Sequence, residues 1–321
     1  MIYQGRSDIG RHPSCHEMKK RKQHYVWEHY LAAWATGMTL YCDHDGRQFP
    51  ASTDKVANER DFYRLKELSA EDLRYVKLLV ERLPHAEARA MASNWITKFQ
   101  APFEINRKYS QGKLKNDAFE AAFDEAVNNL EEDLHAKFEA EAIPLLAELK
   151  QCRASSIFDD AAGVKAAMFI ALQYLRTPSM RRKIGAVNTD EIPGFDIETA
   201  WGVLRTVYST TFAAGLYLRR SLMRVTFLHA SPERGFITGD QPVVNVGDSQ
   251  NEALVQLYYP LSPRLAMLLA FNAKPSSSSE VELSFEETCS YNRRMAAAAD
   301  RQLYAAALAD FGDVRTVGAA G

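Results

Sequence analysis

Residues 196–229, DIETAWGVLRTVYSTTFAAGLYLRRSLMRVTFLH, contain the point at which the chain changes from a helical to a strand pattern. Residues 196–220 are predicted to form one long helix. The apolar stretch inside it, 203–218, is shorter than the roughly 20 apolar residues of a membrane span and contains Arg205. The short runs that follow are rich in β-forming residues and no helical pattern interrupts them, so they predict an antiparallel sheet. The predicted strands are 222–229, 235–238, 254–259 and 265–271.

Upstream of this change the pattern is mainly helical. The run KKRKQHYVWEHYLAAWA from Lys19 predicts an amphipathic helix, and Asp43-His44-Asp45-Gly46 predicts the turn of a β-hairpin between MTLYC and RQFPA. In residues 116–141, apolar side chains recur at steps of three and four, so this helix is expected to turn its acidic face to water. Further helices are predicted from Ser69, from Pro84 to about 103, and over 159–176.

The C-terminal part completes the predicted architecture. Residues 274–279 are expected to be a polar linker and residues 284–309 an Ala-rich final helix. The fold class is therefore α+β: a predominantly helical N-terminal two-thirds with a small β-hairpin, packed on a C-terminal antiparallel sheet and a final helix. Residues 1–18 lack periodicity and are expected to be a flexible tail. Residues 19–321 are expected to form a single large α+β domain, with its helical part at about 19–220 and the sheet and closing helix at about 221–321.

The composition is that of an ordinary globular protein. Of 321 residues, 46% are apolar and 25% charged, and 39 basic side chains face 41 acidic ones for a net charge of −2. This near balance argues against a whole-protein field that would attract nucleic acid or an anionic membrane. The four cysteines are far apart, and no apolar leader follows basic residues at the N-terminus. We therefore expect a cytoplasmic protein with reduced thiols and no membrane partner.

Four short motifs, widely separated in the chain, together resemble the bacterial family known as domain of unknown function 4238. They are QHYVWEHYLAAW from Gln23, LQYLRTPSMR from Leu172, FITGDQPVV from Phe236 and YNRRMAAAADRQLYA from Tyr291. Trp27 stands where that family usually has proline. The resemblance covers about residues 20–305 and implies kinship with proteins that have no settled activity, so it implies no chemistry.

The motifs contain two candidate catalytic residues in opposite halves of the chain. His24 follows shortly after four basic residues, and a neutral imidazole there could act as a general base or bind a metal or phosphate. The alternative is a histidine that hydrogen-bonds a neighbouring loop. Asp240 follows a strand and precedes Gln241-Pro242, where it is either a functional carboxylate or a turn residue bonded to its own backbone.

A second group of candidates lies at helix ends. Gln173 and Arg176 are three residues apart on an apolar helix and share a face. A buried arginine needs a partner, which is either an anionic ligand or Asp240, although Arg176 could also satisfy the last carbonyls of its helix. Asn292 is the fourth catalytic candidate, with a helix-terminus hydrogen bond as the alternative. Tyr25, beside His24, joins Gln173 as a candidate binding residue.

Two functions compete for these residues. One is a hydrolytic, nuclease-like enzyme acting on a phosphate-containing or nucleic-acid substrate, in which Asp240 binds a metal or acts as the base and Arg176 stabilises the phosphate. The alternative is a non-catalytic binding or regulatory protein in which the same residues form a buried structural network. Convergence around an open pocket would favour the enzyme, and a closed network the alternative.

The sequence leaves the cofactor undetermined. A divalent metal is compatible with the candidate residues, and nucleic acid or a phosphate ligand is compatible as a partner. The cluster from Cys42 to Asp45 has metal-ligand residue types, but four consecutive residues in a tight turn do not converge on one ion. No HExxH, P-loop, GxGxxG or GxSxG motif is present, which excludes the familiar mechanisms that those motifs serve.

Overall fold

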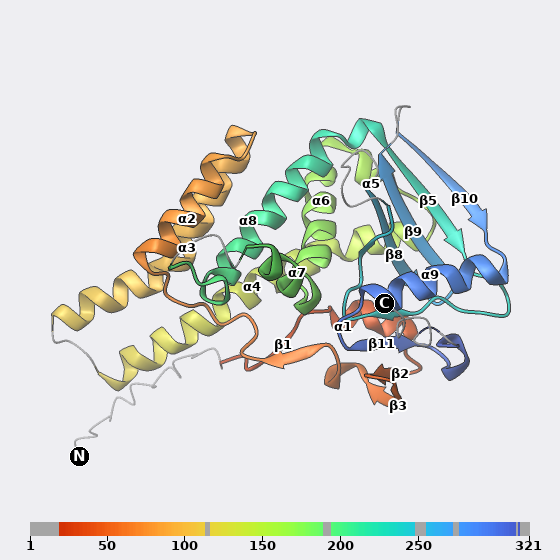
Figure 1. The fold of residues 1–321 in the computed structure, drawn as a ribbon, viewed down its shortest axis with the longest axis horizontal. Helices are drawn as coiled ribbons and strands as arrows, with labels where there is room; N and C mark the ends of the chain where they lie inside the picture. Colours follow the sequence, from red (N-terminus) through yellow and green to blue (C-terminus); the bar gives the residue numbers. More distant parts are fainter. Residues whose placement is uncertain are drawn as a thin grey trace, which may run out of the picture.

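The computed structural model describes residues 19–112, 116–188, 194–247, 255–271, 276–312 and 314. The predicted tail at 1–18 lies outside the described residues. The α+β class is confirmed, because helices dominate the N-terminal part of the chain and the larger sheets lie mostly towards its C-terminus (Figure 1). Within the described part of the chain, no helix has both the length and the apolar character that crossing a membrane requires.

The helical region forms where the sequence has strong caps and 3.6-residue periodicity. Ser69 caps α2 in a reciprocal capping box with Asp72, and Asn116 caps α4. Pro144 stays inside α4, which continues to Leu149. The helices of this region are α2 (Ala70–Glu81), α3 (Ala86–Gln111), α4 (Asp117–Leu149), α5 (Ser155–Phe158), α6 (Asp160–Leu175), α7 (Pro178–Asn188) and α8 (Ile197–Leu218).

The larger sheet has the strand order β10-β5-β9-β8-β7. Its pairs are antiparallel, except that the edge strand β10 runs parallel to β5. The predicted strands over 222–229 and 265–271 are confirmed as β5 and β9, and residues 256–259 of the strand predicted over 254–259 belong to β8. The strand predicted over 235–238 is wrong except at Thr238, which begins β6 of the second sheet. The strands are β5 (Met223–His229), β7 (Val244–Asn245), β8 (Gln256–Ser262), β9 (Leu265–Phe271) and β10 (Ser277–Glu282).

A second sheet has the order β3-β2-β11-β6, and a separate pair is formed by β1 and β4. The predicted hairpin is confirmed as β2 and β3. Asp45 and Gly46 at its turn have φ angles of 53° and 88°, and two successive positive φ angles are what a two-residue type I′ turn requires. The strands are β1 (Lys22–His24), β2 (Thr39–His44), β3 (Arg47–Ser52), β4 (Asn58–Arg60), β6 (Thr238–Gly239) and β11 (Gln302–Ala305).

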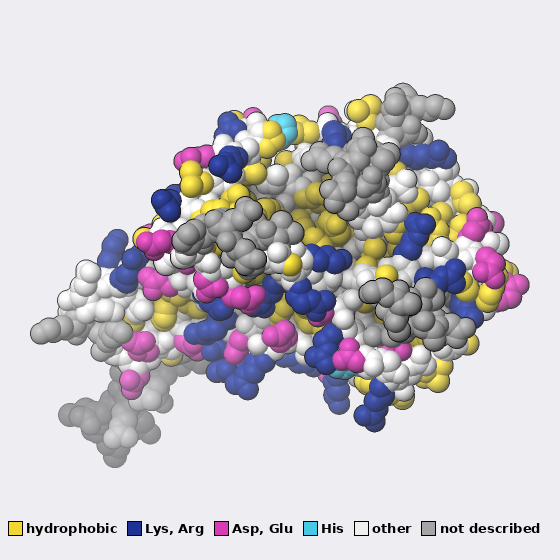
Figure 2. Space-filling model, in the orientation of Figure 1, with side chains coloured by type: hydrophobic (Ala, Val, Ile, Leu, Met, Phe, Trp, Pro, Cys, Tyr) yellow, Lys and Arg dark blue, Asp and Glu magenta, His cyan; other side chains and the backbone are white. Residues whose placement is uncertain are grey.

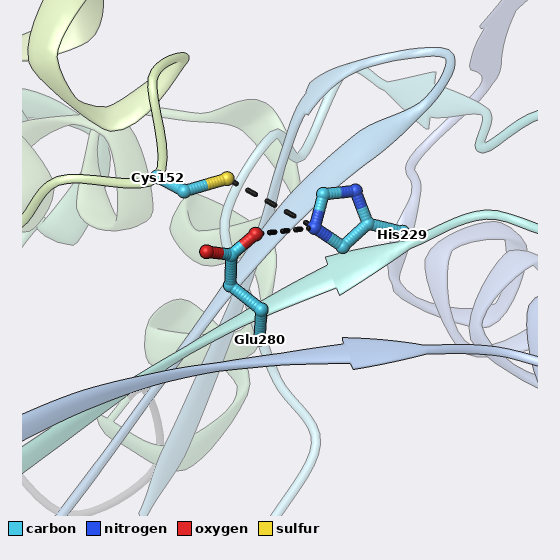
Figure 3. A group of neighbouring side chains, drawn as sticks. All are labelled: Cys152, His229 and Glu280. Carbon is cyan, nitrogen blue, oxygen red and sulfur yellow. Dashed lines mark hydrogen bonds and ion pairs between the residues drawn. The ribbon is translucent and has the colours of Figure 1, made fainter.

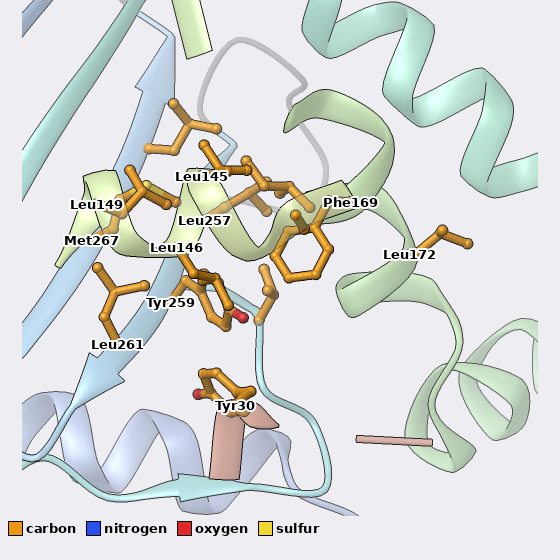
Figure 4. Close-up of a cluster of buried hydrophobic side chains, with 14 of the residues drawn as sticks. Tyr30, Leu145, Leu146, Leu149, Phe169, Leu172, Leu257, Tyr259, Leu261 and Met267 are labelled. Atoms are coloured by element: carbon orange, nitrogen blue, oxygen red, sulfur yellow. The ribbon is translucent and has the colours of Figure 1, made fainter. Parts of the chain in front are cut away.

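One hydrophobic core joins the helical region to the larger sheet. On β8, Tyr259 faces the helices and Tyr258 faces the opposite side, and both are fully buried. Figure 4 shows side chains of α4, including Leu146, and of α6, including Phe169, around Tyr259. Tyr30, from the short helix α1 (Glu28–Leu31), stacks on Tyr259 with ring centroids 5.1 Å apart. The N-terminal motif is therefore part of the same core as the sheet.

Three further predicted elements are wrong. The chain from Lys19 is not one helix, because Lys22–His24 pairs with β4 as strand β1 and only the short α1 follows. The final helix α9 (Phe285–Ala298) ends before residue 309, because Gln302–Ala305 is held as strand β11 between β2 and β6. Ser277–Glu282 is not a linker, because it pairs along its whole length with β5.

Candidate functional site

The four motifs meet where the helical region joins the sheets. From the first motif, the Trp34 indole donates to the carbonyl of Phe236 at 2.8 Å, and the Tyr30 hydroxyl lies 2.8 Å from that of Thr238 in the third motif. From the second motif, the Thr177 hydroxyl bonds the side chain of Gln241. We call this set of contacts the motif junction.

Asp240 lies in the motif junction, and backbone amides of the fourth motif bind both of its carboxylate oxygens. The N–H groups of Asp300, Arg301 and Gln302 donate to it at 2.6, 2.7 and 2.8 Å. The residue is 1% exposed. Asp240 thus holds the turn that leads into β11, 60 residues away in sequence.

Asn292 has the same kind of role on α9. Its side-chain oxygen accepts from the backbone N–H of Ile237 at 3.1 Å, and its nitrogen donates to the carbonyl of Gly235 at 2.9 Å. These bonds fix the segment that precedes β6. Tyr25 is buried near Asp240, and burial, helped by the Asp240 charge, raises the pKa of its hydroxyl.

Arg176 finds its partner inside the helical region. Its guanidinium pairs with Glu139 of α4 at 2.6 Å and also donates to the Gln173 side-chain oxygen at 3.3 Å. Arg176 and Gln173 are both 1% exposed. Burial lowers the pKa of His24, and the nearby positive charge of Arg176 adds to this effect. His24 Nε2, Gln173 Nε2 and Arg176 Nε have no hydrogen-bond partner among the described residues.

The candidate residues therefore form two groups. Gln173 and Arg176 lie at the Arg176–Glu139 ion pair, where each has an unpaired buried nitrogen, and His24 is linked to them by the electrostatic effect of Arg176 on its ring. Asp240 and Asn292 hold backbone segments of the sheet region.

A second buried ion pair escaped the sequence analysis. Arg205 of α8 donates through Nε and Nη2 to one oxygen of Glu131 on α4, at 2.9 and 2.6 Å. Glu131 is 0% exposed, so the expectation that the acids of this helix face water is wrong at this position. The signal was Arg205 itself, a charge inside a long apolar stretch, which requires a buried partner. His135, one turn after Glu131, packs against the pair, and burial lowers its pKa to about 4.

Arg205 reaches a surface cleft of about 310 Å³, which we call the Arg205 cleft. Aromatic rings hold its guanidinium, with Tyr63 at 4.8 Å and Phe62 at 5.3 Å from the ring centroids. Arg205 Nη1 and Trp201 Nε1 are buried donors with no acceptor among the described residues. The basic side chains Arg64, Lys66 and Arg181 also line this cleft, together with the acids Glu59, Asp61 and Glu198.

The acids of the cleft are partly neutralised by arginines around it. Asp61 lies 3.3 Å from Arg21, and Glu198 is paired with Arg181. Lys66 donates to the backbone carbonyl of Glu198 at 3.2 Å. Figure 2 shows Lys and Arg side chains gathered across the lower middle of one face, over β1 and α7, with acidic side chains among them.

A separate cluster joins Cys152, His229 and Glu280 (Figure 3). One ring nitrogen of His229, Nε2, lies 3.9 Å from the thiol and 2.9 Å from a carboxylate oxygen of Glu280. Burial and the Glu280 carboxylate raise the pKa of the Cys152 thiol to about 11. A nucleophilic cysteine needs the opposite shift, so the cluster does not have the electrostatics of a cysteine–histidine nucleophile.

Comparison with known proteins gives one match. The family model described as protein of unknown function DUF4238 matches residues 22–207 and 203–307. No curated protein and no solved structure matches the chain. The match spans all four motifs and, beyond the motif junction, also covers the Arg205 cleft and the Cys152 cluster.

Proposed function

The chain belongs to the DUF4238 family, whose function is unknown, and from this premise we propose that it binds a small phosphate-bearing ligand in the Arg205 cleft. The observation that carries the proposal is a pair of buried donors, Arg205 Nη1 and Trp201 Nε1, which have no acceptor among the described residues and belong to side chains that line the cleft. In this proposal the four family motifs have a structural role, because they join the helical region to the sheets.

The donors favour an anion on energetic grounds. A buried donor without a partner costs about 1–3 kcal/mol, and an anionic oxygen removes that cost when it binds. The Arg205 guanidinium is held by Glu131 and by the surrounding rings, so it loses little freedom when it meets a ligand. Arginine matches phosphate because two parallel N–H groups can face two oxygens.

The volume of the cleft limits the ligand. About 310 Å³ is at the lower end of the range of ligand pockets, which begins at roughly 300 Å³. The ligand class is therefore a phosphate-bearing molecule of about the size of a mononucleotide, or one terminal nucleotide of a longer strand.

The assignments in the sheet region support binding over hydrolysis. Asp240 was the candidate metal ligand or base, and its two oxygens already accept three backbone N–H groups. Asn292 bonds the backbone on both its amide atoms. Such saturation favours the non-catalytic binding or regulatory alternative over the hydrolytic, nuclease-like enzyme.

The test is a set of thermal melts with inorganic phosphate, pyrophosphate, a mononucleotide and a short single-stranded DNA. Trp201→Phe removes the indole N–H from the cleft, and Trp95→Phe is the matched control because Trp95 Nε1 on α3 also lacks a partner but does not line the cleft. At least one ligand should raise the melting temperature of the wild type and of Trp95→Phe. Trp201→Phe should weaken that ligand about tenfold, as expected for one hydrogen bond to a charged group.

Three outcomes would count against the proposal. One is that no probe stabilises the wild type, and another is that Trp95→Phe loses the effect as fully as Trp201→Phe. The third is cleavage of the mononucleotide or the DNA with Mg²⁺ or Mn²⁺ by the wild type but not by His24→Ala. That result would support the hydrolytic enzyme in place of the binding protein.

A further inference from the structure

We propose that Cys152, His229 and Glu280 form a Zn²⁺ site with three protein ligands and a fourth position for water or another ligand. The proposal is independent of the Arg205 cleft, with which these residues share no lining side chain. Figure 3 shows the thiol and the carboxylate directed at the same ring nitrogen of His229. Among the described residues, this is the group of His, Cys and acidic side chains whose ligand atoms lie together, all within 4.8 Å.

The spacing of the three atoms is close to that of a tetrahedral zinc site. Zinc bond lengths of about 2.0–2.3 Å place neighbouring ligand atoms about 3.4–3.6 Å apart. The distance from His229 Nε2 to the Cys152 sulfur is 3.9 Å and to the Glu280 oxygen 2.9 Å. Rotation of the exposed Glu280 side chain can lengthen the shorter of these distances, and because that side chain is 59% exposed an ion can enter from solvent.

Two of the ligands are placed by the sheet. β10 runs parallel to β5, and the register pairs Glu282 with His229. Glu280 is two residues before Glu282 and so projects from the same face of the sheet as His229. A strand pair is a rigid support, and metal sites depend on such support for their geometry.

Cys152 occupies a backbone position that normally selects glycine. It lies just after α4 with a φ angle of 55°. The N–H of Arg153 bonds the carbonyl of Glu148, and the N–H of Cys152 bonds that of Leu149, which is the Schellman pattern at a helix end. Glycine is usual at this left-handed position, because a side chain there is strained. A strained residue that carries a ligand atom indicates a role beyond the turn.

The ligand types select the ion. Thiolate and imidazole favour zinc over magnesium or calcium, which prefer oxygen ligands. A carboxylate is also a common zinc ligand in sites that have three protein ligands and an open fourth position. On binding, the Cys152 S–H bond breaks and an S–Zn bond forms, while the proton passes to solvent. His229 and Glu280 contribute lone pairs, and water molecules of the hydrated ion leave as the three protein ligands bind.

The experiment uses the chelator-treated full chain titrated with Zn²⁺ and with Co²⁺, whose bond to a thiolate absorbs in the near ultraviolet. Cys152→Gly removes the thiol and gives the turn its preferred residue, so the metal-free variant should melt at or above the wild-type temperature. Cys289→Ala is the matched control, because Cys289 on α9 is a half-buried free cysteine outside the cluster. His229→Gln and Glu280→Gln test the other two ligands.

The expected result is one Co²⁺–thiolate band per chain and a Zn²⁺-dependent rise in melting temperature, in the wild type and in Cys289→Ala. Both signals should vanish in Cys152→Gly, although that protein is folded and no less stable. His229→Gln and Glu280→Gln should each weaken Zn²⁺ about tenfold or more, since even loss of an outer-shell partner costs that much. Absence of the band in the wild type would overturn the proposal. So would its persistence in Cys152→Gly, because another cysteine would then be the ligand.

Discussion

Two buried ion pairs join helices of the helical region, whereas Asp240 and Asn292 in the sheet region bond to the backbone. Glu131 with Arg205 and Glu139 with Arg176 are ion pairs between helices, and each involves side chains that are almost or entirely buried. Asp240 instead binds the N–H groups of residues 300–302. Both arrangements satisfy the rule that buried polar groups need partners.

The two arrangements leave different amounts of unused hydrogen-bonding capacity. A carboxylate that accepts three backbone N–H groups has little left for a ligand. A guanidinium has five N–H groups, and Arg205 leaves Nη1 unpaired while Arg176 leaves Nε unpaired. Buried ion pairs are also costly to desolvate, so they are weak evidence for stability alone. We therefore expect ligand binding in the helical region, and we expect the bonds of Asp240 in the sheet region to contribute to stability.

The largest effect is expected from Glu131→Gln. The change keeps the shape of the side chain but leaves the buried Arg205 charge without its partner, which should cost about 3–5 kcal/mol of unfolding free energy. Asp133→Asn is the matched control two residues further along α4. Asp133 pairs with Lys20, but its side chain is 43% exposed, so the change should cost about 0.5 kcal/mol or less.

Urea denaturation of both variants measures the contrast. Equal losses would show that the Glu131–Arg205 pair contributes no more than a surface pair. Replacing both partners together, as Glu131→Leu with Arg205→Met, should recover much of the loss, since apolar side chains of similar volume often replace a buried ion pair at little cost.

The same periodicity that predicted α4 hid this pair. Steps of three and four identify which face of the helix is apolar on average. They do not show that Glu131, unlike the other acids of α4, is buried, because that depends on where Arg205 lies. Sequence reasoning succeeded where local chemistry decides the structure, as at the Asp45-Gly46 turn and the Ser69 cap. It failed at Gln302–Ala305, because helix-forming alanines surround a strand whose partners lie far away in sequence.

The candidate site shows the same limit. The motifs identified His24, Arg176, Asp240 and Asn292 as polar residues in apolar surroundings, and the last three are buried and have ion-pair or hydrogen-bond partners. Which partners they find depends on contacts between residues far apart in sequence, such as Asp240 with Asp300 and Arg176 with Glu139. The Cys152 cluster joins three segments that share no local pattern, so no motif could indicate it.

An intermediate effect is expected from Asp240→Asn. The asparagine amide keeps one oxygen as an acceptor, but its NH₂ group replaces the other oxygen and faces a backbone N–H. At least one buried backbone N–H therefore loses its hydrogen-bond partner. We expect a loss of about 2–3 kcal/mol, measured by thermal and urea melts. A melting temperature at or above that of the wild type, with loss of a Mg²⁺- or Mn²⁺-dependent shift, would contradict the structural role. Asp240 would then be a functional carboxylate held at a cost to stability.

The smallest effect, and the one that depends on pH, concerns Glu132, the neighbour of Glu131 on α4. Burial raises the pKa of Glu132 to about 7 from its ordinary value of 4.5, although Arg176 opposes the shift. Because the folded-state pKa lies above the unfolded one, folding favours the protonated form. That stabilisation is complete below about pH 4.5 and is lost as the pH rises through 7.

Glu132→Gln keeps the side chain in its neutral form at every pH. One pKa unit corresponds to about 1.4 kcal/mol, and the partial exposure of Glu132 reduces the full effect, so the variant should be about 1–2 kcal/mol more stable than the wild type at pH 8. The two proteins should converge towards pH 4.5. His135, whose folded-state pKa is about 4, loses its stabilising contribution as the pH falls from 6.5 through 4. Because both proteins contain His135, this contribution cancels when the stability of the wild type is subtracted from that of the variant. Urea melts at intervals from pH 5 to pH 8 measure that difference. If the variant is less stable than the wild type at pH 8, the charged Glu132 carboxylate stabilises the fold by pairing with Arg176. Arg176 would then have less hydrogen-bonding capacity left for a ligand than the comparison of the two regions assumes.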